Sequence, residues 1–234
     1  MKVHCIGSES KGNVYLFVAD NGDVLIVEAG ISFSEVKKAL GFDLSGIVGC
    51  ITSHRHFDHS KYITEFTRAG VDVYCNTDTI EAMNLKGNHR VTMYNETIFQ
   101  LGSFTIRPFP VRHTVPCYGF LIAHKESGKI LFVTDAAWVP QVFTGLSHIM
   151  VEANYSDEAM SNNHGVGAHM ELSTALDFIK ANSSADLRNV VLLHLSATNS
   201  DERKFVDAVK AIMPHADVVA ADKGVTVNLN KLLF

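Results

Sequence analysis

Tryptophan, proline and cysteine are scarce in this chain of 234 residues, which has one tryptophan, five prolines and four cysteines. The cysteines stand singly in apolar strands or loops, without a Cys-x-x-Cys pair, so we expect reduced core thiols rather than a disulfide framework. No stretch approaches the roughly 18 apolar residues of a membrane span. The start, MKVHCIGSES, has no long apolar run either, so we expect no signal peptide and a cytoplasmic location.

An excess of positive charge is also absent. The chain has 20 Lys and Arg against 25 Asp and Glu, a formal net charge of −5. This excludes an overall attraction to nucleic acid or anionic membrane, although a local basic patch stays open. With 47% hydrophobic residues the chain can bury a sizeable core. Because it shows no repeat, linker or low-complexity tract, we predict a single domain over residues 1–234.

Short β-rich runs alternate with helical segments, which predicts an α/β layered sandwich with its helices on the outside. Strands are expected at Val3–Ile6, Val14–Val18, Val24–Val27, Gly46–Thr52, Val71–Cys75, Phe104–Pro108, Tyr118–Ala123, Ile130–Thr134, His148–Glu152, Val190–Leu195, Val218–Ala221 and Val225–Leu229. Helices are expected from a Ser34 cap to Leu40 and at Lys61–Ala69, Thr79–Leu85, Leu172–Ala181 and Asp201–Met213. The dipeptides Asn21-Gly22, Ser127-Gly128 and Lys223-Gly224 predict hairpins.

Twelve histidines are an unusual number for a chain of this length, and three of them lie in the segment SHRHFDHS. His54, His56, Asp58 and His59 directly follow an apolar strand. In extended backbone the first three would project to one side and His59 to the other. If the segment bends, it offers two imidazoles to one metal and an Asp/His pair to a second. A solvated polar loop would explain one or two histidines, but not three and an aspartate at a strand end.

Three further candidates follow other predicted strands. His113 comes after Val111, Asp135 after ILFVT, and His194 after VVLL. Taken alone, each is more often structural, since a strand-end Asp commonly caps the next segment and a lone His is commonly a core group. Open α/β sheets gather their ligand sites at the carboxyl ends of strands, however, and this shared position makes all three candidate ligands.

The pattern HxHxDH followed by a His, an Asp and a last His resembles the metallo-β-lactamase superfamily. Seven segments are similar to its YycJ-like branch and to phage-encoded relatives such as the anti-Pycsar enzymes: GSESKGNVYLFV, LIVEAGIS, ITSHRHFDHS, VRHTVPCYGF, FVTDAAWV, VEANYS and LLHLSATNS. The resemblance covers nearly the whole chain. It implies a four-layer αββα sandwich with a dinuclear metal site, in a bacterium or in the cytosol of a phage-infected host.

The resemblance also implies a complete set of metal ligands. One metal would be held by His54, His56 and His113, the other by Asp58, His59 and His194, with Asp135 bridging the two. Nitrogen and oxygen ligands without a thiolate suit two Zn²⁺ ions, with Mn²⁺ or Fe as alternatives. Such a site with a bridging hydroxide carries a net charge of about +1, attracts phosphate and lowers the pKa of bound water toward 7.

Asp58 and His169 are the candidate catalytic residues. His169 lies where the YycJ-like branch has GHLSN, whereas this chain has GAHMEL, and we interpret it as a phosphate clamp or general acid. An exposed residue before a helix is the alternative interpretation. Glu28 stands where the family usually has Asp and is expected to lie near the metals as a structural partner. His164 is a further candidate because it neighbours His169, and the loop Gly7–Asn13 is either an anion-binding loop or a plain turn.

Three functions stay open at this point. The first is a phosphodiesterase acting on a small cyclic nucleotide, the second a YycJ-like DNA exonuclease, and the third a non-catalytic binding protein stabilised by metals. The scattered basic residues, with no run longer than Lys37-Lys38, favour the small nucleotide over DNA, while the motif match to the YycJ-like branch favours the exonuclease. Tyr155 or Tyr118 would then contact the base. A homodimer in which one subunit completes the other's pocket is a further expectation.

Overall fold

The computed structural model describes residues 1–156 and 167–231, and the chain divides into two compact units. Unit 1 comprises Met1–Pro108 and Asp222–Asn228, and unit 2 comprises Phe109–Ala221 and Leu229–Phe234. Each unit has its own hydrophobic core and is described by itself below. The single domain expected over residues 1–234 stays a prediction.

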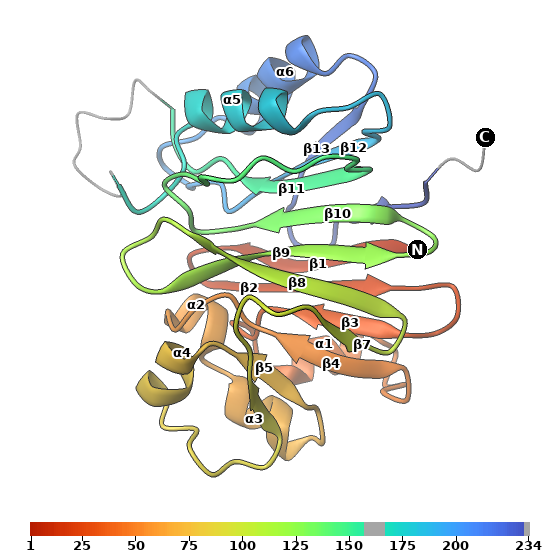
Figure 1. The fold of residues 1–234 in the computed structure, drawn as a ribbon, viewed down its shortest axis with the longest axis vertical. Helices are drawn as coiled ribbons and strands as arrows, with labels where there is room; N and C mark the ends of the chain where they lie inside the picture. Colours follow the sequence, from red (N-terminus) through yellow and green to blue (C-terminus); the bar gives the residue numbers. More distant parts are fainter. Residues whose placement is uncertain (157–166, 232–234) are drawn as a thin grey trace. The chain divides into compact units, whose positions relative to one another are not determined.

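The first sheet lies entirely in unit 1 (Figure 1). Its seven strands, in spatial order, are β14 (Thr226–Asn228), β1 (Lys2–Glu9), β2 (Gly12–Val18), β3 (Val24–Val27), β4 (Ile47–Ile51), β5 (Val73–Cys75) and β6 (Val91–Met93). The strands from β14 to β3 pair antiparallel, and those from β3 to β6 pair parallel. The predicted hairpin at Asn21-Gly22 is confirmed, since it joins β2 to β3.

Four helices of unit 1 connect these strands: α1 (Phe33–Ala39), α2 (Phe57–Ser60), α3 (Ile63–Arg68) and α4 (Thr77–Ala82). Helices α1 and α3 bury one face each in the core of unit 1, where the rings of Phe33 and Phe66 lie 4.9 Å apart. The expected Ser34 cap is wrong. Helix α1 begins at Phe33, and the Ser34 hydroxyl lies inside it, 2.9 Å from the Ser32 hydroxyl.

The second sheet also has seven strands and, like the first, contains both parallel and antiparallel pairs. They are β13 (Asp217–Ala220), β12 (Asn189–Leu193), β11 (His148–Glu152), β10 (Gly128–Val133), β9 (Cys117–His124), β8 (Phe104–Val111) and β7 (Phe99–Leu101). The β7–β8 and β9–β10 pairs are antiparallel, and the strands from β10 to β13 pair parallel. The boundary between the two units falls inside β8.

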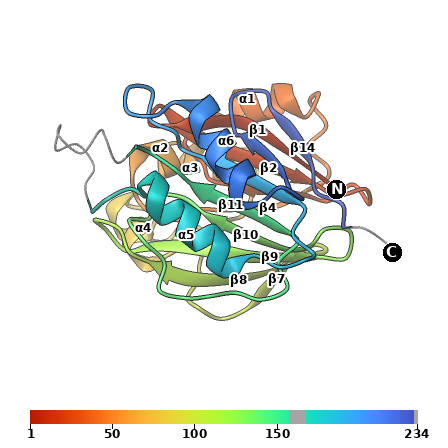
Figure 2. The same cartoon turned by 90° about the horizontal axis from the view of Figure 1, so that it is seen from above.

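Helices α5 (Leu172–Asn182) and α6 (Glu202–Ile212) contact each other and the parallel part of the second sheet (Figure 2). Both place apolar residues at helical spacing on one face: Ala175 and Ile179 in α5, and Phe205 and Val209 in α6. These side chains pack into the core of unit 2. Within the described part of the chain, none of the helices has the length and apolar character needed to cross a membrane.

The predicted last hairpin is wrong. Strand β13 pairs parallel with β12 in the second sheet, whereas β14 pairs antiparallel with β1 in the first. A turn does form at Lys223-Gly224, with Gly224 at a φ of 89°. The amide of Gly224 donates to the carbonyl of Cys5, however, and so directs the chain along β1 rather than back onto β13. A local turn motif could not distinguish these two partners. Strands β6 and β7 were not predicted.

Candidate metal centre

Three residues that follow strands directly have left-handed backbone conformations. Glu28 follows β3 with a φ of 72°, Asp135 lies just past β10 with a φ of 47°, and His194 follows β12 with a φ of 52°. For residues other than glycine this region costs of the order of 1 kcal/mol or more, and it persists where the surrounding structure requires it. Among the described residues, two others, Phe42 and Asn84, share this conformation away from the site, so three of these five strained positions lie at strand ends that carry candidate site residues.

In unit 1 the candidate ligands lie on the segment between β4 and α3, which bends as the sequence analysis required. His54 Nε2 lies 3.0 Å from His56 Nδ1. After this pair the chain turns into α2, where His59 Nε2 lies 3.2 Å from Asp58 Oδ2. The segment therefore presents two pairs of ligand atoms, one of two nitrogens and one of a nitrogen and a carboxylate oxygen.

Glu28 contacts the ligand segment of unit 1 at two points and so helps to orient it. Its side chain is fully buried, and its two carboxylate oxygens accept the amide of Ser53 at 3.3 and 3.2 Å. One of these oxygens also lies 3.4 Å from His59 Nδ1. A carboxylate behind a ligand histidine fixes the orientation of the ring and raises the basicity of the nitrogen that faces the metal. The structure thus places Glu28 beside a candidate ligand, as we expected.

The backbone around Asp58 and His59 is held by residues distant in the sequence. The Asn13 side-chain amide donates to the carbonyl of Asp58 at 3.3 Å and lies 3.1 Å from His59 Nε2. The Ala29 amide donates to the carbonyl of His59 at 2.8 Å. A Cβ atom on Gly30 would lie 1.6 Å from the carbonyl oxygen of Asp58, so only glycine fits there.

In unit 2, Asp135 lies between two imidazoles. Its Oδ2 atom is 3.8 Å from His113 Nε2, and its Oδ1 atom is 3.7 Å from His194 Nε2. Both distances exceed those of hydrogen bonds, so each carboxylate oxygen faces a different ring nitrogen without donating or accepting a proton directly. An aspartate with this geometry can offer one oxygen to each of two cations.

Glu152, in unit 2, is fully buried, and its carboxylate contacts three other segments of the chain. Its Oε2 atom accepts the amides of Ala136 at 2.8 Å and Met170 at 3.2 Å. Its Oε1 atom lies 2.6 Å from His169 Nδ1 and 3.6 Å from His194 Nδ1. Because both oxygens are already engaged, we interpret Glu152 as the group that orients the two histidines.

His169 lies among the candidate ligands of unit 2. Its ring stacks on that of His194 with 5.3 Å between the centroids, and the His113 ring meets it edge-on at 5.7 Å. Burial lowers the pKa of His169, but the hydrogen bond to Glu152 and the charge of Glu152 outweigh burial, so the pKa is raised above its ordinary value. The protonated form of His169 is therefore favoured.

The backbone on either side of His169 also contacts residues of this cluster. The carbonyl of Ala168 lies 2.6 Å from His113 Nδ1, and the carbonyl of Met170 accepts the amide of Asn154 at 2.9 Å. The Asn154 side chain in turn donates to the carbonyl of His194 at 2.8 Å and lies 3.1 Å from His194 Nδ1. The GAHMEL segment is thus an integral part of this cluster.

The donor atoms fit divalent metals. In unit 2, ligand atoms of Asp135, Glu152, His169 and His194 lie within 4.8 Å of one another, and unit 1 supplies its two ligand pairs on one segment. The four cysteines are buried and form no disulfide, and burial raises the pKa of Cys5 and Cys75 to about 12. A site of imidazoles and carboxylates without thiolate is compatible with Zn²⁺, Mn²⁺ or Fe.

Most of the predicted site residues fall into these two clusters, one in each unit. Unit 1 contains His54, His56, Asp58 and His59, and unit 2 contains His113, Asp135, His169 and His194. Tyr155 is only 6% exposed, so it offers little ring surface to a base, contrary to expectation. The Gly7–Asn13 loop is the β1–β2 hairpin, which the plain-turn interpretation predicts. His164 lies outside the described residues.

Four orienting residues were not identified from the sequence: Asn13, Ser53, Glu152 and Asn154. The signal for the last two was available, because Glu152 ends the buried strand β11 and Asn154 lies two residues further on, and polar residues at a strand end are candidates for a site. Asn13 lies in β2 and carries no such signal. Its role depends on the chain placing β2 beside the ligand segment.

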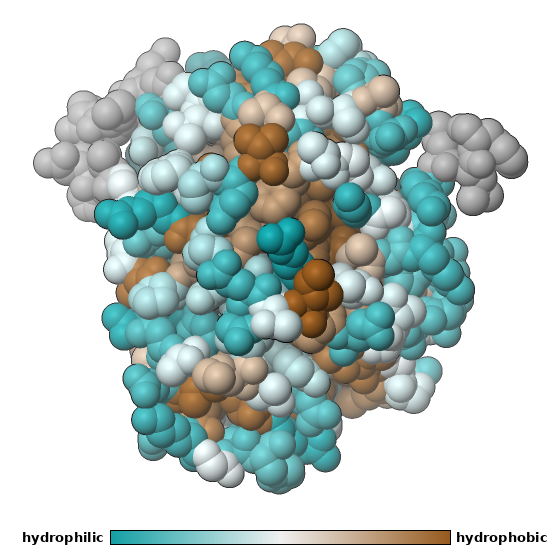
Figure 3. All heavy atoms as spheres, in the orientation of Figure 1, coloured by the Kyte–Doolittle hydropathy of each residue, from teal (hydrophilic) through white to brown (hydrophobic). Residues whose placement is uncertain are grey.

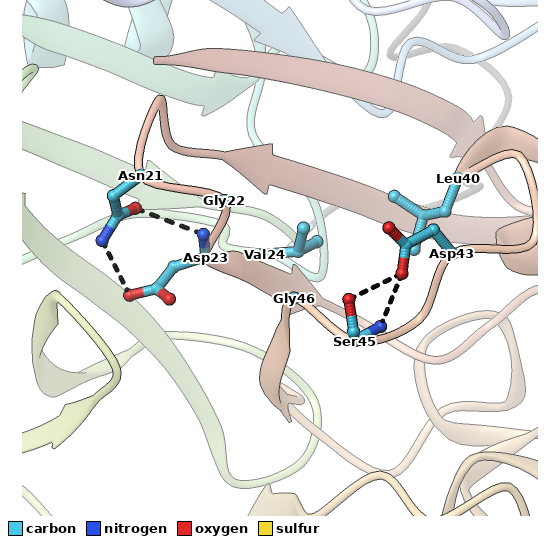
Figure 4. Close-up of a pocket in the computed structure, with 8 residues that line it drawn as sticks. All are labelled: Asn21, Gly22, Asp23, Val24, Leu40, Asp43, Ser45 and Gly46. Carbon is cyan, nitrogen blue, oxygen red and sulfur yellow. Dashed lines mark hydrogen bonds between the residues drawn. The ribbon is translucent and has the colours of Figure 1, made fainter.

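A cavity of about 420 Å³ in unit 1 is separate from these clusters (Figure 4). It is lined by Asn21, Gly22, Asp23, Val24, Leu40, Asp43, Ser45 and Gly46. These residues precede β3 and β4, whereas Glu28 and the histidine segment follow the same strands. The cavity therefore lies at the opposite end of these strands from the candidate ligands.

A comparison with protein families gives a match to the β-lactamase superfamily domain over residues 25–195, a range that contains the residues of both clusters. The chain belongs to the β-lactamase superfamily. The matched region includes all seven predicted metal ligands and His169, so the expectation of a metal-dependent hydrolase from this superfamily is confirmed. A search of curated proteins finds no match.

Solved structures show the same fold. The metallo-β-lactamase fold protein YhfI from Bacillus subtilis is 20% identical, with a TM-score of 0.79 over 97% of this chain and 98% of that one. A diphosphatase from the PhnP family is 16% identical, with a TM-score of 0.73 over 99% and 98%. The short form of human tRNase Z is 15% identical, with a TM-score of 0.68 over 98% and 99%. The predicted α/β metallo-β-lactamase fold class is confirmed.

Proposed function

We propose that this member of the β-lactamase superfamily is a dinuclear-metal phosphodiesterase that acts on a nucleotide, with the cytosol as its predicted location. In this proposal His54, His56 and His113 hold one metal, Asp58, His59 and His194 hold the other, and Asp135 bridges them. The ligand pairs of unit 1 and the two-sided position of Asp135 in unit 2 support the assignment, each within its own unit.

The pairing of His169 with Glu152 is the observation that carries the proposal. Cleavage of a phosphodiester requires a proton for the leaving oxygen, and a histidine held at Nδ1 keeps its Nε2 atom available for that transfer. The 2.6 Å contact with Glu152 fixes the ring and favours its protonated form. Bound divalent metals would supply Lewis acidity and a water molecule of lowered pKa, and Asp58, the other candidate catalytic residue, would hold one of these metals.

A small cyclic nucleotide is the substrate that we favour. The net charge of −5 and the scattered basic residues argue against a surface that neutralises many phosphates. The diphosphatase and the tRNase Z that share the fold, by their descriptions, act on phosphate-containing substrates, which supports the broader class. A YycJ-like DNA exonuclease is the second candidate, because the motifs of this chain resemble that branch. A metal-stabilised binding protein is the third.

The deciding experiment compares substrates on protein loaded with Zn²⁺ or Mn²⁺. Purified protein is incubated with a panel of cyclic nucleotides and with 5′-labelled duplex DNA at low and physiological salt. We expect hydrolysis of at least one cyclic nucleotide with a KM that changes little with salt. DNA affinity, in contrast, would fall with a slope of about −0.9 per neutralised phosphate. Processive degradation of DNA with inert cyclic nucleotides would establish the exonuclease instead.

The role of His169 is tested in the same assay. We expect His169→Ala to lower turnover by about 10²- to 10⁴-fold, the usual range for a positioned proton donor, while the metal content stays unchanged. His215→Ala is the matched control, since His215 is exposed and lies outside both clusters. Equal turnover in the two variants would contradict the role of His169. Nucleotide binding without any turnover in the parent protein would favour the binding protein.

A further inference from the structure

The only tryptophan of the chain, Trp138, is half exposed, which is unusual for such a large apolar side chain. It lies three residues after Asp135 in an extended segment, residues 137–144, where exposed and partly buried residues alternate. Polar and apolar residues are interspersed on the molecular face drawn in Figure 3. An exposed indole three residues from a candidate ligand needs an explanation.

Trp138 is held by its backbone rather than by its ring. It forms an antiparallel bridge with Arg112, whose amide donates to the Trp138 carbonyl at 3.1 Å. The Ala137 amide donates to the Arg112 carbonyl at 2.7 Å. Residues opposite each other in such a bridge project to the same side, with Cβ atoms about 5 Å apart. Arg112 is also exposed, so a cationic and an aromatic side chain start from opposite backbone positions on the exposed side of this bridge.

The segment that carries Trp138 is fixed on its other side by the core of unit 2. Val139 and Phe143 pack against that core, and the Phe143 ring lies 4.6 Å from that of Phe109. The Phe143 amide also donates to the Asn182 side chain at 2.6 Å. The indole is thus presented on a rigid support, which lowers the entropy lost when a ligand binds.

This pair adjoins the candidate metal ligands of unit 2. Arg112 directly precedes His113, whose side chain is almost fully buried and faces Asp135. Trp138 is separated from Asp135 by a span of at most about 10 Å along the chain. Among the described residues, neither the guanidinium of Arg112 nor the indole of Trp138 makes a side-chain hydrogen bond, ion pair or ring contact that would account for its position.

We propose that Trp138 and Arg112 form a nucleotide-reading platform, in which the indole stacks on the base and the guanidinium pairs with a phosphate oxygen. Aromatic rings stack on bases of every type, and a guanidinium matches the geometry of phosphate. The pairing of these two groups specifies a nucleoside phosphate rather than an inorganic phosphate or a simple phosphodiester. This inference rests on the proposed function in one respect, because it takes the bound nucleotide to be the substrate of the enzyme.

The first test uses the intrinsic fluorescence of Trp138, which reports on this position alone because the chain has no other tryptophan. We expect AMP to quench the emission saturably, and ribose 5-phosphate, which lacks the base, to leave it unchanged. Arg112→Ala is expected to weaken the binding of AMP about tenfold and that of adenosine little, with Arg112→Lys intermediate. Equal quenching by AMP and ribose 5-phosphate, or none by either, would overturn the platform.

The second test compares two diesters with the same leaving group: the p-nitrophenyl ester of thymidine 5′-phosphate and methyl p-nitrophenyl phosphate, which has no base. We expect Trp138→Ala to lower the ratio of their kcat/KM values by about 10- to 100-fold, mainly through the KM of the thymidine ester. Trp138→Phe should restore most of the ratio, since a phenyl ring also stacks. An unchanged ratio in Trp138→Ala would overturn the platform.

Val142→Ala is the matched control, because Val142 is 64% exposed on the same segment but lies outside the platform. We expect it to leave the ratio unchanged. If Trp138→Ala and Val142→Ala both abolish self-association in sedimentation and neither alters nucleotide binding, the segment is an interface with a second copy and the platform is wrong. Saturable quenching by AMP without hydrolysis of cyclic nucleotides, DNA or either ester would refute the proposed function and leave the platform standing.

Discussion

The two units hold their candidate ligands with the same kinds of residue but deliver them differently. Each unit has one fully buried glutamate behind a histidine, Glu28 in unit 1 and Glu152 in unit 2. Each also has an asparagine whose amide reaches both a ligand backbone carbonyl and an imidazole nitrogen, Asn13 and Asn154. Unit 1 nevertheless gathers its ligands on one short segment, whereas unit 2 takes them from three strand ends.

This difference changes how each unit responds to mutation. In unit 1 the positions of the ligands depend on one bend and on the residues that clamp it, so a local clash should disturb them together. In unit 2 the parallel register of β10, β11 and β12 sets the positions of Asp135, Glu152 and His194. Asp135 faces two imidazoles there, one from each of its carboxylate oxygens.

The largest difference is expected between Asp135→Ala and Asp58→Ala. Under the proposed ligand sets, Asp135→Ala removes the bridge and should empty or halve the metal content, because neither metal keeps a full set of ligands. Asp58→Ala should remove only the metal that Asp58, His59 and His194 would hold. Elemental analysis of the purified variants measures this directly. Two metals per chain retained in Asp135→Ala would contradict the assignment.

Gly30→Ala tests the clamp on the ligand segment of unit 1. The added Cβ atom would lie 1.6 Å from the Asp58 carbonyl oxygen, so the segment must move, and we expect a loss of stability of several kcal/mol together with weaker metal binding. Gly70→Ala is the control, because no atom lies near its added Cβ and only the φ of 93° opposes alanine, a cost of about 1 kcal/mol. Similar melting temperatures for the two variants would refute the clamp.

The next prediction concerns pH and the core of unit 2. Burial lowers the pKa of His148 to about 4, against 6.5 for an unperturbed histidine. Between these values the unfolded chain binds a proton that the folded chain does not, so stability rises with pH across the window and is lost as the pH falls. The contribution is up to about 3 kcal/mol. His148→Gln should flatten this slope in urea unfolding series, whereas His4→Gln, in the partly exposed β1, should change it less.

The smallest effects are expected from substitution of the two buried glutamates. These two variants should nevertheless differ in the property that changes, metal affinity in unit 1 and turnover in unit 2. Loss of an orienting carboxylate typically costs 10- to 100-fold in metal affinity or activity, about 1.4–2.7 kcal/mol. Glu28→Gln should act mainly on metal affinity, since Glu28 contacts His59. Glu152→Gln should act mainly on turnover per bound metal, since Glu152 holds His169. The same profile in both variants would mean that the two glutamates have equivalent roles.

The sequence predicted the ligand segment of unit 1 more directly than the cluster of unit 2, for a physical reason. His54, His56, Asp58 and His59 are neighbours along the chain, so their spacing alone indicates a shared site. His113, Asp135 and His194 become neighbours only through the order of strands in the second sheet. Their shared position at strand ends made them candidates, but only the resemblance to a family joined them into one ligand set. The hairpin predicted around Gly224 was wrong for the same reason, because the residues of a strand do not determine which other strand pairs with it.

The pairing of β14 with β1 has a consequence for the order in which the protein is synthesised and folds. One side of β1 is hydrogen-bonded to residues 226–228, almost the whole chain away, and its other side to β2. On the ribosome, β1 therefore leaves this edge without its partner strand until residues 226–228 have been translated. An unpaired edge is a template for aggregation, so nascent chains paused before β14 should depend on chaperones more strongly than completed ones.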